Sequence, residues 1–359
     1  MKIIIAGGGT GGHLFPAVAV GEEIVRERPD AQVVYAGTAN GFEARWLPNR
    51  GYRYDLFDVH GVRGHGVGAR LRAVAEFARA VRLARRLVAR FRPDLVVCVG
   101  GYASAPVGVA AAISRVPIVM LEQNVTPGLT NRMLKHFAAR VCISFEASKA
   151  YFPASKVELT GNPIRYRPRS DRIPMERRPA QILVLGGSSG AHRLNIGVVK
   201  AFQIWGKDVI KLKVTHQTGE ADVELVREAY RELPFDAEVV PFIDDVPGAL
   251  AAADLVVARS GAGTVTDIAH AARASILVPY PFHRDMQQLH NAHVLEKLAG
   301  AIIVSDDDRL GDNLAREMRA MLSDPARLAA MGARASQAVF SDSAARVARV
   351  CFKTARVEN

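Results

Sequence analysis

The predicted fold rests on the segment Lys2-Ile3-Ile4-Ile5-Ala6-Gly7-Gly8-Gly9-Thr10-Gly11-Gly12-His13. A β-branched run, a glycine turn and the start of a helical pattern follow one another, which is typical of a βα unit in a parallel sheet. Apolar runs bounded by glycine alternate with helical periodicity along the whole chain. They predict strands at Lys2–Ala6, Gln32–Ala36, Leu95–Val99, Ile118–Leu121, Gln181–Leu185, Lys211–His216, Leu255–Ala258 and Ser275–Val278. The predicted fold class is therefore α/β.

The glycine turn occurs twice in each half of the chain. The first half repeats it at Val99-Gly100-Gly101-Tyr102, and the second half has it at Leu185-Gly186-Gly187-Ser188-Ser189-Gly190 and at Arg259-Ser260-Gly261-Ala262-Gly263-Thr264. A length of 359 residues also suits two domains. We therefore expect two Rossmann-like domains whose parallel sheets face each other across a cleft. Prolines and arginines place the linker between Gly161 and Pro179, so that residues 1–162 and 163–340 form the domains and a helix at about 341–359 packs back on the first.

Composition limits the class of protein. With 49% hydrophobic and 23% charged residues, the chain has the composition of a globular protein, and no apolar run approaches the roughly 20 residues of a spanning helix. The apolar stretch that begins at Lys2 is too short for a signal peptide, so we expect a cytoplasmic location. Cys98, Cys142 and Cys351 are far apart and are expected to be buried free thiols.

The net charge of +11 predicts an anionic partner, which could be nucleic acid, a phosphorylated substrate or acidic lipid. Between Arg63 and Arg92 there are nine arginines against one acid, Glu76. At about 100° per residue, five of them fall within an arc of roughly 80°: Arg72, Arg79, Arg82, Arg86 and Arg90. The same helix carries an apolar stripe of Leu71, Val74, Ala78, Val81, Ala84, Val88 and Phe91. We expect the stripe to pack on the sheet while the arginines contact an anionic membrane surface.

Glycine turns between a strand and a helix bring backbone N–H groups close to an anion, and the helix dipole adds to the attraction. The need for a tight βα turn would also explain the glycines of any single loop. Four such glycine turns at corresponding strand ends, however, suit the binding of pyrophosphate groups. A dinucleotide site would need an acid at the end of the second strand, and Val33–Thr38 supplies none. His13 and Leu14 stand where a Walker A motif needs Lys and Ser or Thr. Dehydrogenase and nucleoside triphosphatase functions are therefore disfavoured.

His13 follows the first glycine turn and is the candidate general base, since a neutral imidazole can accept a hydroxyl proton near neutral pH. Binding an anion is the competing role, because an anion beside the ring favours the imidazolium. His290 and His293 have helical spacing without a third ligand, so we expect no metal site. The acidic runs Asp244-Asp245 and Asp306-Asp307-Asp308 are interpreted as loops and N-caps.

A set of motifs in order resembles the MurG family, bacterial UDP-N-acetylglucosamine:undecaprenyl-pyrophosphoryl-muramoyl-pentapeptide N-acetylglucosaminyltransferases. The motifs cover nearly the whole chain: Gly8-Gly9-Thr10-Gly11-Gly12-His13 with Pro16-Ala17, Gly100-Gly101-Tyr102-x-Ser104-x-Pro106, Glu122-Gln123-Asn124, Gly161-Asn162-Pro163-x-Arg165, Gly186-Gly187-Ser188-x-Gly190-Ala191, His216-Gln217-Thr218-Gly219, Phe242-Ile243-Asp244, Arg259-Ser260-Gly261-Ala262 and Gln287-Gln288-x-x-Asn291-Ala292. Each loop alone is a weak signal, but nine in sequence are specific.

The resemblance implies the glycosyltransferase-B fold and inverting transfer of N-acetylglucosamine to the 4-hydroxyl of the muramoyl sugar of lipid I, giving lipid II. It places the donor contacts at Thr10, Gly11, Gly12, Asn124, Arg165, Ser188, Ile243, Ala262, Gly263, Thr264, Val265, Thr266, Asp267, Gln287 and Gln288. It places the acceptor diphosphate at Gly9, Gly100, Gly101 and Tyr102, with His13 as the catalytic residue. Asp267 stands where the family typically has the glutamate that binds the ribose hydroxyls, and it is one methylene shorter.

The resemblance also implies that no cofactor and no metal takes part, because helix N termini would replace the cation on the diphosphate. The expected partners are UDP-N-acetylglucosamine, an undecaprenyl-pyrophosphate-linked acceptor, the cytoplasmic face of the cell membrane and other cell-wall enzymes, with no nucleic acid. Two alternatives stay open, since fold alone does not fix function. One is a related glycolipid glycosyltransferase or UDP-sugar epimerase, and the other is a non-catalytic sugar-nucleotide-binding scaffold.

Overall fold

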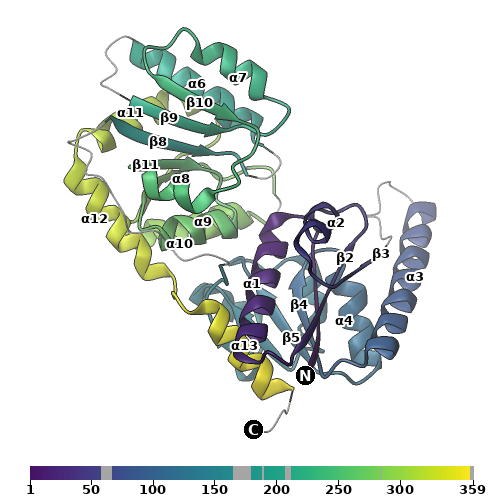
Figure 1. Cartoon of the computed structure of the whole chain (residues 1–359). Helices are drawn as coiled ribbons and strands as arrows, with labels where there is room; N and C mark the ends of the chain where they lie inside the picture. Colours follow the sequence, from purple (N-terminus) through teal and green to yellow (C-terminus); the bar gives the residue numbers. More distant parts are fainter. Residues whose placement is uncertain (58–66, 165–178, 188–189, 207–211, 284, 356–359) are drawn as a thin grey trace. The chain divides into compact units, whose positions relative to one another are not determined.

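The computed structural model describes residues 1–57, 67–164, 179–187, 190–206, 212–283 and 285–355. The chain folds into two compact units, one comprising Met1–Arg165 with Asp342–Asn359 and the other Tyr166–Ser341 (Figure 1). Each unit is built on its own parallel β-sheet covered by helices. The predicted α/β class is confirmed.

The first unit contains a seven-stranded sheet in the order β3-β2-β1-β4-β5-β6-β7, with every pair of neighbours parallel. Its strands are β1 (Lys2–Gly7), β2 (Gln32–Thr38), β3 (Tyr54–Phe57), β4 (Leu95–Gly100), β5 (Ile118–Glu122), β6 (Arg140–Ile143) and β7 (Val157–Leu159). Its α-helices are α1 (Gly11–Glu27), α2 (Phe42–Trp46), α3 (Val67–Phe91), α4 (Ser104–Ile113), α5 (Leu129–Leu134) and α13 (Ser343–Thr354).

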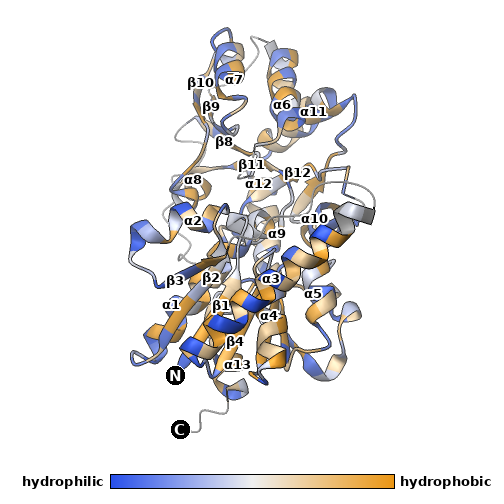
Figure 2. Ribbon diagram, turned by 90° about the vertical axis from the view of Figure 1, so that its right-hand side faces the viewer, coloured by the Kyte–Doolittle hydropathy of each residue, from blue (hydrophilic) through white to orange (hydrophobic). Residues whose placement is uncertain are grey.

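Side chains of β1 alternate between two hydrophobic layers, because successive residues of a strand point to opposite faces of the sheet. Ile3 and Ile5 lie in a cluster with residues of α1 and α13, and Ile4 lies in the opposite cluster with residues of α3, α4 and α5. Figure 2 shows the hydrophobic colouring of the strands between these layers. Helix α13 packs against α1, so the last helix completes the core of the first unit (Figure 1).

The second unit contains a six-stranded parallel sheet in the order β10-β9-β8-β11-β12-β13. Its strands are β8 (Ala180–Leu185), β9 (Leu212–Gln217), β10 (Asp236–Val240), β11 (Leu255–Ala258), β12 (Ala274–Leu277) and β13 (Ala301–Ile303). Its α-helices are α6 (His192–Trp205), α7 (Val223–Tyr230), α8 (Val246–Ala252), α9 (Ala262–His270), α10 (Gln287–Lys297), α11 (Leu310–Leu322) and α12 (Pro325–Ala335). The main core lies under α6, α7 and α11, which cover the face onto which Ile182 and Val184 point.

Both sheets reverse their strand order beside the central strand. From β1 the chain adds β2 and β3 on one side and then β4 on the other, and from β8 it adds β9 and β10 and then β11. This order is that of a doubly wound Rossmann-like sheet, in which ligands bind at the carboxyl ends of the two strands flanking the reversal. The predicted internal duplication is therefore visible as the same topology in both units.

The predicted strands are all present within one or two residues of their predicted ends, with Lys211 outside the described residues. The predicted stripe on α3 is only partly correct. Ala84 and Val88 are buried against the sheet, but Leu71 and Val74 are each 67% exposed because the first turns of this helix extend beyond the core. No helix in the described segments has both the length and the apolarity needed to span a bilayer.

Cys98, Cys142 and Cys351 are free and buried, which confirms the interpretation as structural thiols. Burial raises the pKa of Cys98 and of Cys351 to about 12. A buried thiol with such a pKa carries almost no thiolate at neutral pH, so neither residue is a nucleophile.

Candidate active site

The glycine turns lie at the carboxyl ends of the strands that flank the reversal in each sheet. In the first unit these are the turns after β1 and β4, and in the second unit those after β8 and β11. At such a point the two helices that follow leave toward opposite faces of the sheet, and ligands of open α/β sheets commonly bind between the turns. The structure thus brings together, within each unit, the loops that the sequence predicts to bind ligands.

The turn after β1 presents the N terminus of α1. Gly8 and Gly9 have φ angles of 157° and 90°, and α1 begins at Gly11 with Thr10 as an N-cap whose side chain makes no capping hydrogen bond. The amides of an uncapped first turn, reinforced by the macrodipole of a 17-residue helix, favour an anion. The Gly9 amide is already paired, since it donates to Glu43 Oε2 at 2.7 Å.

The turn after β4 approaches the first one so closely that only glycine fits. A Cβ on Gly101 would lie 2.3 Å from the carbonyl oxygen of Gly8, and a Cβ on Gly100 would lie 2.9 Å from His13 Nε2. The Gly100 amide donates to Ser104 Oγ at 3.0 Å. Because the Gly9 and Gly100 amides have internal partners, an anion here would be met by the start of α1 rather than by these two groups.

The exposed side chain of Tyr102 and a hydrogen bond to the Gly101 carbonyl complete the description of this turn. Tyr102 directly follows the two glycines and its side chain is exposed. The Gly101 carbonyl accepts a hydrogen bond from Thr130 Oγ1 at 3.3 Å, which fixes the orientation of the turn.

His13 lies half-buried on the first turn of α1, between Thr10 and Gly100. Its Nδ1 is 3.3 Å from Thr10 Oγ1. Burial lowers the pKa of His13 below its ordinary value, and the negative charge of Glu43 partly opposes this effect. The imidazole is therefore neutral near pH 7. In the tautomer whose Nδ1–H donates to Thr10, Nε2 is left as a proton acceptor.

Asn124 follows β5 and is fixed by the buried carboxyl group of Glu122. Both the backbone N and Nδ2 of Asn124 donate to Glu122 Oε1, at 2.9 and 3.2 Å, and Asn131 Nδ2 donates to Glu122 Oε2 at 2.8 Å. Burial raises the pKa of Glu122, while these hydrogen bonds act in the opposite direction. Glu122 thus holds Asn124 in one orientation at the strand end.

In the second unit, α9 begins at Ala262 with Gly261 as its N-cap, a residue without a side chain to cap the first turn. Val265 and Thr266 are fully buried, and Thr266 Oγ1 donates to the Ala262 carbonyl at 2.8 Å. Thr264 and Asp267 are partly exposed and lie one turn apart on the same face of the helix. Of the donor contacts predicted on this helix, Thr264 and Asp267 therefore present side chains, whereas Val265 and Thr266 offer a ligand only backbone groups.

Gln217 ties two predicted donor loops together. Its Oε1 accepts from the Gly187 amide at 3.1 Å, and its Nε2 donates to the carbonyl oxygens of Gly187 at 2.9 Å and Pro241 at 3.1 Å. Gly187 belongs to the turn after β8, and Pro241 is two residues before Ile243 in the loop after β10. The side chain of Gln217 therefore fixes the spacing between the two loops.

Gln288 ties the start of α10 to the ends of β11 and β12. Gln288 Oε1 accepts from the Tyr280 amide at 2.9 Å, and its carbonyl accepts from Ser260 Oγ at 2.8 Å. Gln287 is the first residue of α10, and Met286 before it has a φ angle of 46°, which is uncommon for a residue with a side chain. The predicted donor contacts Gln287 and Gln288 are thus positioned by a strained cap and by two neighbouring loops.

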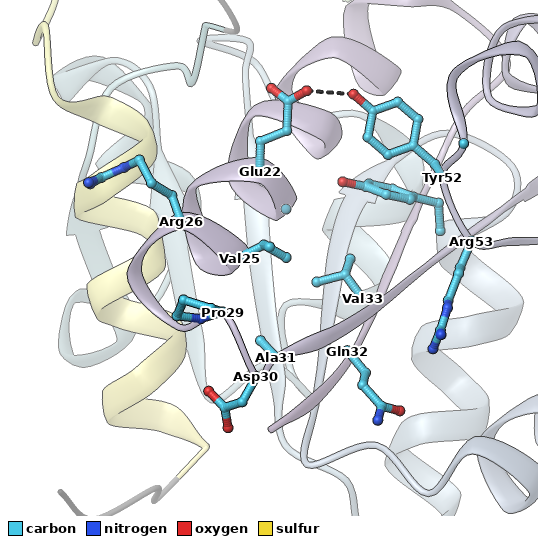
Figure 3. A pocket seen from close by; sticks show the side chains of 13 residues that line it. Glu22, Val25, Arg26, Pro29, Asp30, Ala31, Gln32, Val33, Tyr52 and Arg53 are labelled. Carbon is cyan, nitrogen blue, oxygen red and sulfur yellow. Dashed lines mark hydrogen bonds between the residues drawn. The ribbon is translucent and has the colours of Figure 1, made fainter.

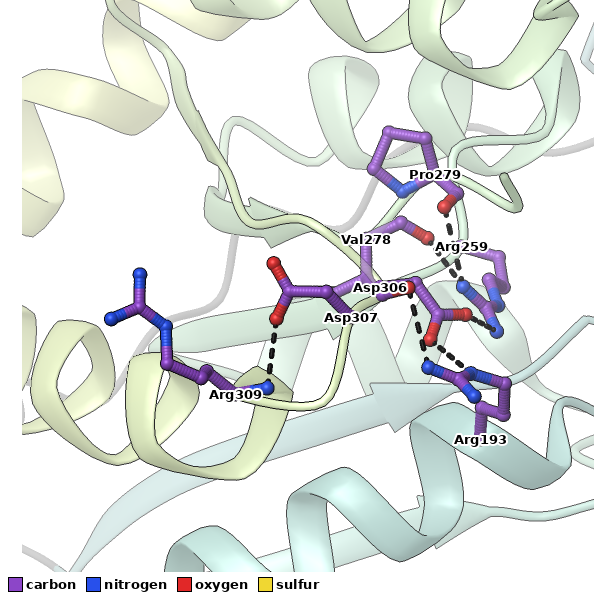
Figure 4. A network of polar contacts seen from close by, with 7 residues as sticks. All are labelled: Arg193, Arg259, Val278, Pro279, Asp306, Asp307 and Arg309. Carbon is purple, nitrogen blue, oxygen red and sulfur yellow. Dashed lines mark hydrogen bonds and ion pairs between the residues drawn. The ribbon is translucent and has the colours of Figure 1, made fainter.

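An ion-pair network beneath these loops is shown in Figure 4. The fully buried carboxylate of Asp306 contacts Arg259 Nη2 at 2.8 Å and Arg193 Nε at 2.6 Å. Arg259 Nη1 in turn donates to the carbonyl of Val278 at 3.0 Å. Asp306 therefore does more than form a loop, because its carboxylate pairs with Arg259 in the turn between β11 and the N-cap of α9.

Two other acidic residues, Asp307 and Asp245, differ in their capping roles. The N-cap of α11 is Arg309, whose amide donates to Asp307 Oδ1 at 2.9 Å, so the expected aspartate N-cap is wrong for this helix. Asp245 is the N-cap of α8 and accepts from the Gly248 amide at 3.0 Å, as expected.

Two predicted donor residues, Arg165 and Ser188, lie outside the described residues. Sequence reasoning gave no positioning role to four of the buried polar side chains near the loops: Glu43, Glu122, Gln217 and Asp306. Glu122, Gln217 and the acidic run at Asp306 each adjoin a strand end or motif, which is a usable signal, whereas no local pattern singles out Glu43.

A cavity of about 570 Å³ lies elsewhere in the first unit (Figure 3). It is lined by the second half of α1, the beginning of β2 and residues 51–53, and the Tyr52 hydroxyl meets Glu22 Oε1 at its edge, 2.5 Å away. These elements lie at the amino ends of the strands, so the cavity is at the opposite edge of the sheet from the glycine turns.

Comparisons with known proteins agree with the two-unit architecture. Residues 3–143 match the glycosyltransferase family 28 N-terminal domain, and residues 181–347 match the glycosyltransferase family 28 C-terminal domain. The UDP-N-acetylglucosamine–N-acetylmuramyl-(pentapeptide) pyrophosphoryl-undecaprenol N-acetylglucosamine transferase of Geobacter sulfurreducens is 41% identical over 100% of both chains. The crystal structure of Acinetobacter baumannii MurG superposes with a TM-score of 0.79 at 30% identity, over 98% of this chain and 99% of that one.

A putative UDP-N-acetylglucosamine 2-epimerase from Listeria monocytogenes has a TM-score of 0.74 but only 12% identity, over 100% of this chain and 97% of that one. At that identity the likeness shows the fold alone. The two family models and the similar crystal structure thus define a family 28 glycosyltransferase with the glycosyltransferase-B fold. Within that class, the chain belongs to the MurG family of N-acetylglucosaminyltransferases.

Replacing Asp306 by alanine should destabilise the second unit by about 3–5 kcal/mol, because Arg259 would stay buried without its counter-charge. Arg259 is only 8% exposed in its side chain, whereas Arg193 is 44% exposed. Arg193→Ala is therefore the matched control and should cost far less. Thermal unfolding followed by circular dichroism measures both, and equal losses in the two variants would contradict the role assigned to the buried pair.

Proposed function

We propose that this chain transfers N-acetylglucosamine from UDP-N-acetylglucosamine to the 4-hydroxyl of the muramoyl sugar of lipid I, giving lipid II for peptidoglycan synthesis. The observation that carries the proposal is the 41% identity, over the full length of both chains, to a relative named for this transfer. The uncapped helix N termini at the strand reversals of both units suit the pyrophosphate groups of donor and acceptor.

The donor nucleotide would bind the second unit. The start of α9 faces its diphosphate, Asp267 and Thr264 lie on the helix face next to its ribose, and backbone groups near Ile243 hold the uracil. Gln287 and Gln288 would bind hydroxyls of the transferred sugar, with Arg165 and Ser188 beside the phosphates. The resemblance to the family also predicts donor contacts at Thr10, Gly11, Gly12 and Asn124 of the first unit.

The reaction would be a single inverting displacement. The acceptor oxygen forms a bond to the anomeric carbon while the bond from that carbon to the UDP oxygen breaks, and UDP leaves with the electron pair. His13 takes the proton of the attacking hydroxyl at Nε2. Its low pKa supports this role, because the ring is neutral and can accept a proton near pH 7. The helix N terminus would stabilise the charge that develops on UDP without a metal ion.

Membrane attachment of the first unit is supported by exposed apolar residues beside arginines. Leu71 and Val74 on α3 and, from α5 onward, Leu129, Met133 and Phe137 are exposed large hydrophobic residues. Helix α4 packs against both α3 and α5, so the two groups lie on the same side of the sheet. Exposed apolar side chains with arginines between them are typical of a protein that lies on an anionic bilayer surface. We therefore place the protein peripherally on the cytoplasmic face of the cell membrane.

Mass spectrometry of the product tests the function. With UDP-N-acetylglucosamine and lipid I, the purified protein should form lipid II and release UDP. An epimerase of the same fold would instead convert the sugar nucleotide without any acceptor, and a binding scaffold would bind UDP without turnover. Either of those results would overturn the proposal.

His13→Ala should lower kcat by roughly 10²–10⁴-fold with little change in the affinity for UDP, because a general base contributes about that much. In the unmodified protein, kcat/KM should fall at acidic pH with an inflection below about 6.5, since burial depresses the pKa of His13. His136→Ala, which removes an exposed histidine of the same unit, is the control. A near-normal kcat of His13→Ala at saturating acceptor, with a raised KM for the lipid, would assign His13 to binding instead.

The triple change Arg79/Arg82/Arg86→Glu should weaken binding to anionic vesicles by roughly 100-fold or more, because each arginine near the surface contributes about 1 kcal/mol. Leu71→Ser with Val74→Ser should weaken binding to the same vesicles through lost apolar contact. Leu225→Ser, at an exposed leucine of α7 in the second unit, is the matched control and should have no effect. Vesicle sedimentation that is insensitive to all of these changes and to anionic lipid content would reject the proposed surface.

A further inference from the structure

Glu43 is a buried acid that the mechanism above does not use. It is the second residue of the short helix α2, and its side chain is fully buried. Its Oε1 accepts from the Thr38 amide and from Thr38 Oγ1, both at 2.7 Å, and its Oε2 accepts from the Gly9 amide at 2.7 Å. Among the described residues, Glu43 accepts these three hydrogen bonds and donates none, which is the pattern of a carboxylate. Glu43 therefore joins the end of β2 to the turn after β1.

Three glycines make room for this carboxyl group. A Cβ on Gly8 would lie 2.1 Å from Glu43 Oε1, one on Gly41 would lie 2.3 Å from the same oxygen, and one on Gly37 would lie 2.5 Å from Glu43 Cγ. Real Cβ atoms do not approach other atoms so closely, so a side chain at any of these positions would displace Glu43. The conformation of the β1–α1 turn and the presence of the carboxylate are thus coupled.

The same carboxylate is linked to His13 through the β1–α1 turn, because Gly9, which donates to Glu43 Oε2, directly precedes Thr10, whose Oγ1 is 3.3 Å from His13 Nδ1. Among the described residues, Thr10 of its own helix and Gly100 of the turn after β4 lie next to the imidazole, and Glu43 of α2 influences it through its charge. Among the described residues, Glu43 is the charged group that raises the pKa of His13 against the effect of burial. A negative charge held near a base favours the protonated ring, as the aspartate of a Ser-His-Asp triad does by direct contact.

We propose that Glu43 is a positioning residue for the transfer reaction: it holds the β1–α1 turn through Gly9 and stabilises the imidazolium that forms when His13 accepts the acceptor proton. This inference rests on the proposed function of His13. It differs from a purely structural role because the charge of Glu43, and not only its shape, is required.

Glu43→Gln separates the charge from the shape, and the pKa of His13 is the direct readout. Removing a negative charge should lower the pKa of His13, whereas a loosened turn that exposes the ring would raise it toward 6.5. Proton NMR titration of the imidazole signals measures this pKa, with the His13 signal assigned by its loss in His13→Gln. The acidic limb of the kcat/KM profile should move to lower pH, and kcat should fall roughly tenfold, the factor that corresponds to one pKa unit.

Thr38→Val is the matched control. It removes the hydroxyl donor of Thr38 to Glu43 but keeps the carboxylate, so the pKa of His13 should stay near that of the unmodified protein. Glu43→Asp keeps the charge but withdraws it by one methylene, so the pKa should fall less than in Glu43→Gln. If Glu43→Gln does not fold, Glu43→Asp alone tests the role of Glu43, because the pKa of His13 should still be lowered in that variant.

The outcomes separate this inference from the proposed function. A pKa of His13 that is unchanged or raised in the Glu43 variants overturns the inference, whatever their activity. A pKa that falls while the pH profile of kcat/KM stays fixed shows that His13 is not the base, which overturns the catalytic part of the inference together with that part of the proposed function. The inference and the proposed function are both supported if the pKa of His13 and the inflection of the kcat/KM profile both fall. Both should then be lowest in Glu43→Gln and intermediate in Glu43→Asp.

Discussion

The reversal of strand order beside β1 and beside β8 is the constraint on which the rest of the structure depends. Because the chain leaves one strand toward one face and its neighbour toward the other, the two turns diverge and their helix N termini are left open at the strand ends. Only residues without a Cβ allow the turns to approach as Gly8 and Gly101 do. The close approach of the turns and the position of their helix N termini follow from this topology.

A layer of buried polar side chains keeps these open turns in one conformation. Glu122 orients Asn124, Gln217 joins the loops after β8 and β10, and Asp306 pairs with Arg259 in the turn between β11 and α9. Each of these side chains bonds directly to the backbone or to a charged partner, which is how buried polar groups remain stable in a protein interior. The candidate site therefore owes its shape to residues that do not touch the substrates in the proposed mechanism.

The sequence predicted the central strands and the glycine turns because a buried parallel strand is a continuous apolar run and a tight turn needs glycine. It did not predict β3, β6, β7, β10 or β13, each of which has only three to five residues. It overestimated the packing of α3, because periodicity cannot show where the sheet beneath the helix ends. Glu43 was missed for a different reason: its partners, Gly9 and Thr38, are brought to it by tertiary folding and leave no local pattern.

A crystal structure of the protein with UDP-N-acetylglucosamine bound tests the central claim most directly, which is that the strand reversals are the ligand sites. The account predicts diphosphate oxygens within hydrogen-bonding distance of the first backbone N–H groups of α9, with the ribose beside Asp267 and the uracil at the backbone near Ile243. A nucleotide bound instead in the cavity between α1 and the beginning of β2, with no contact to α9, would contradict it.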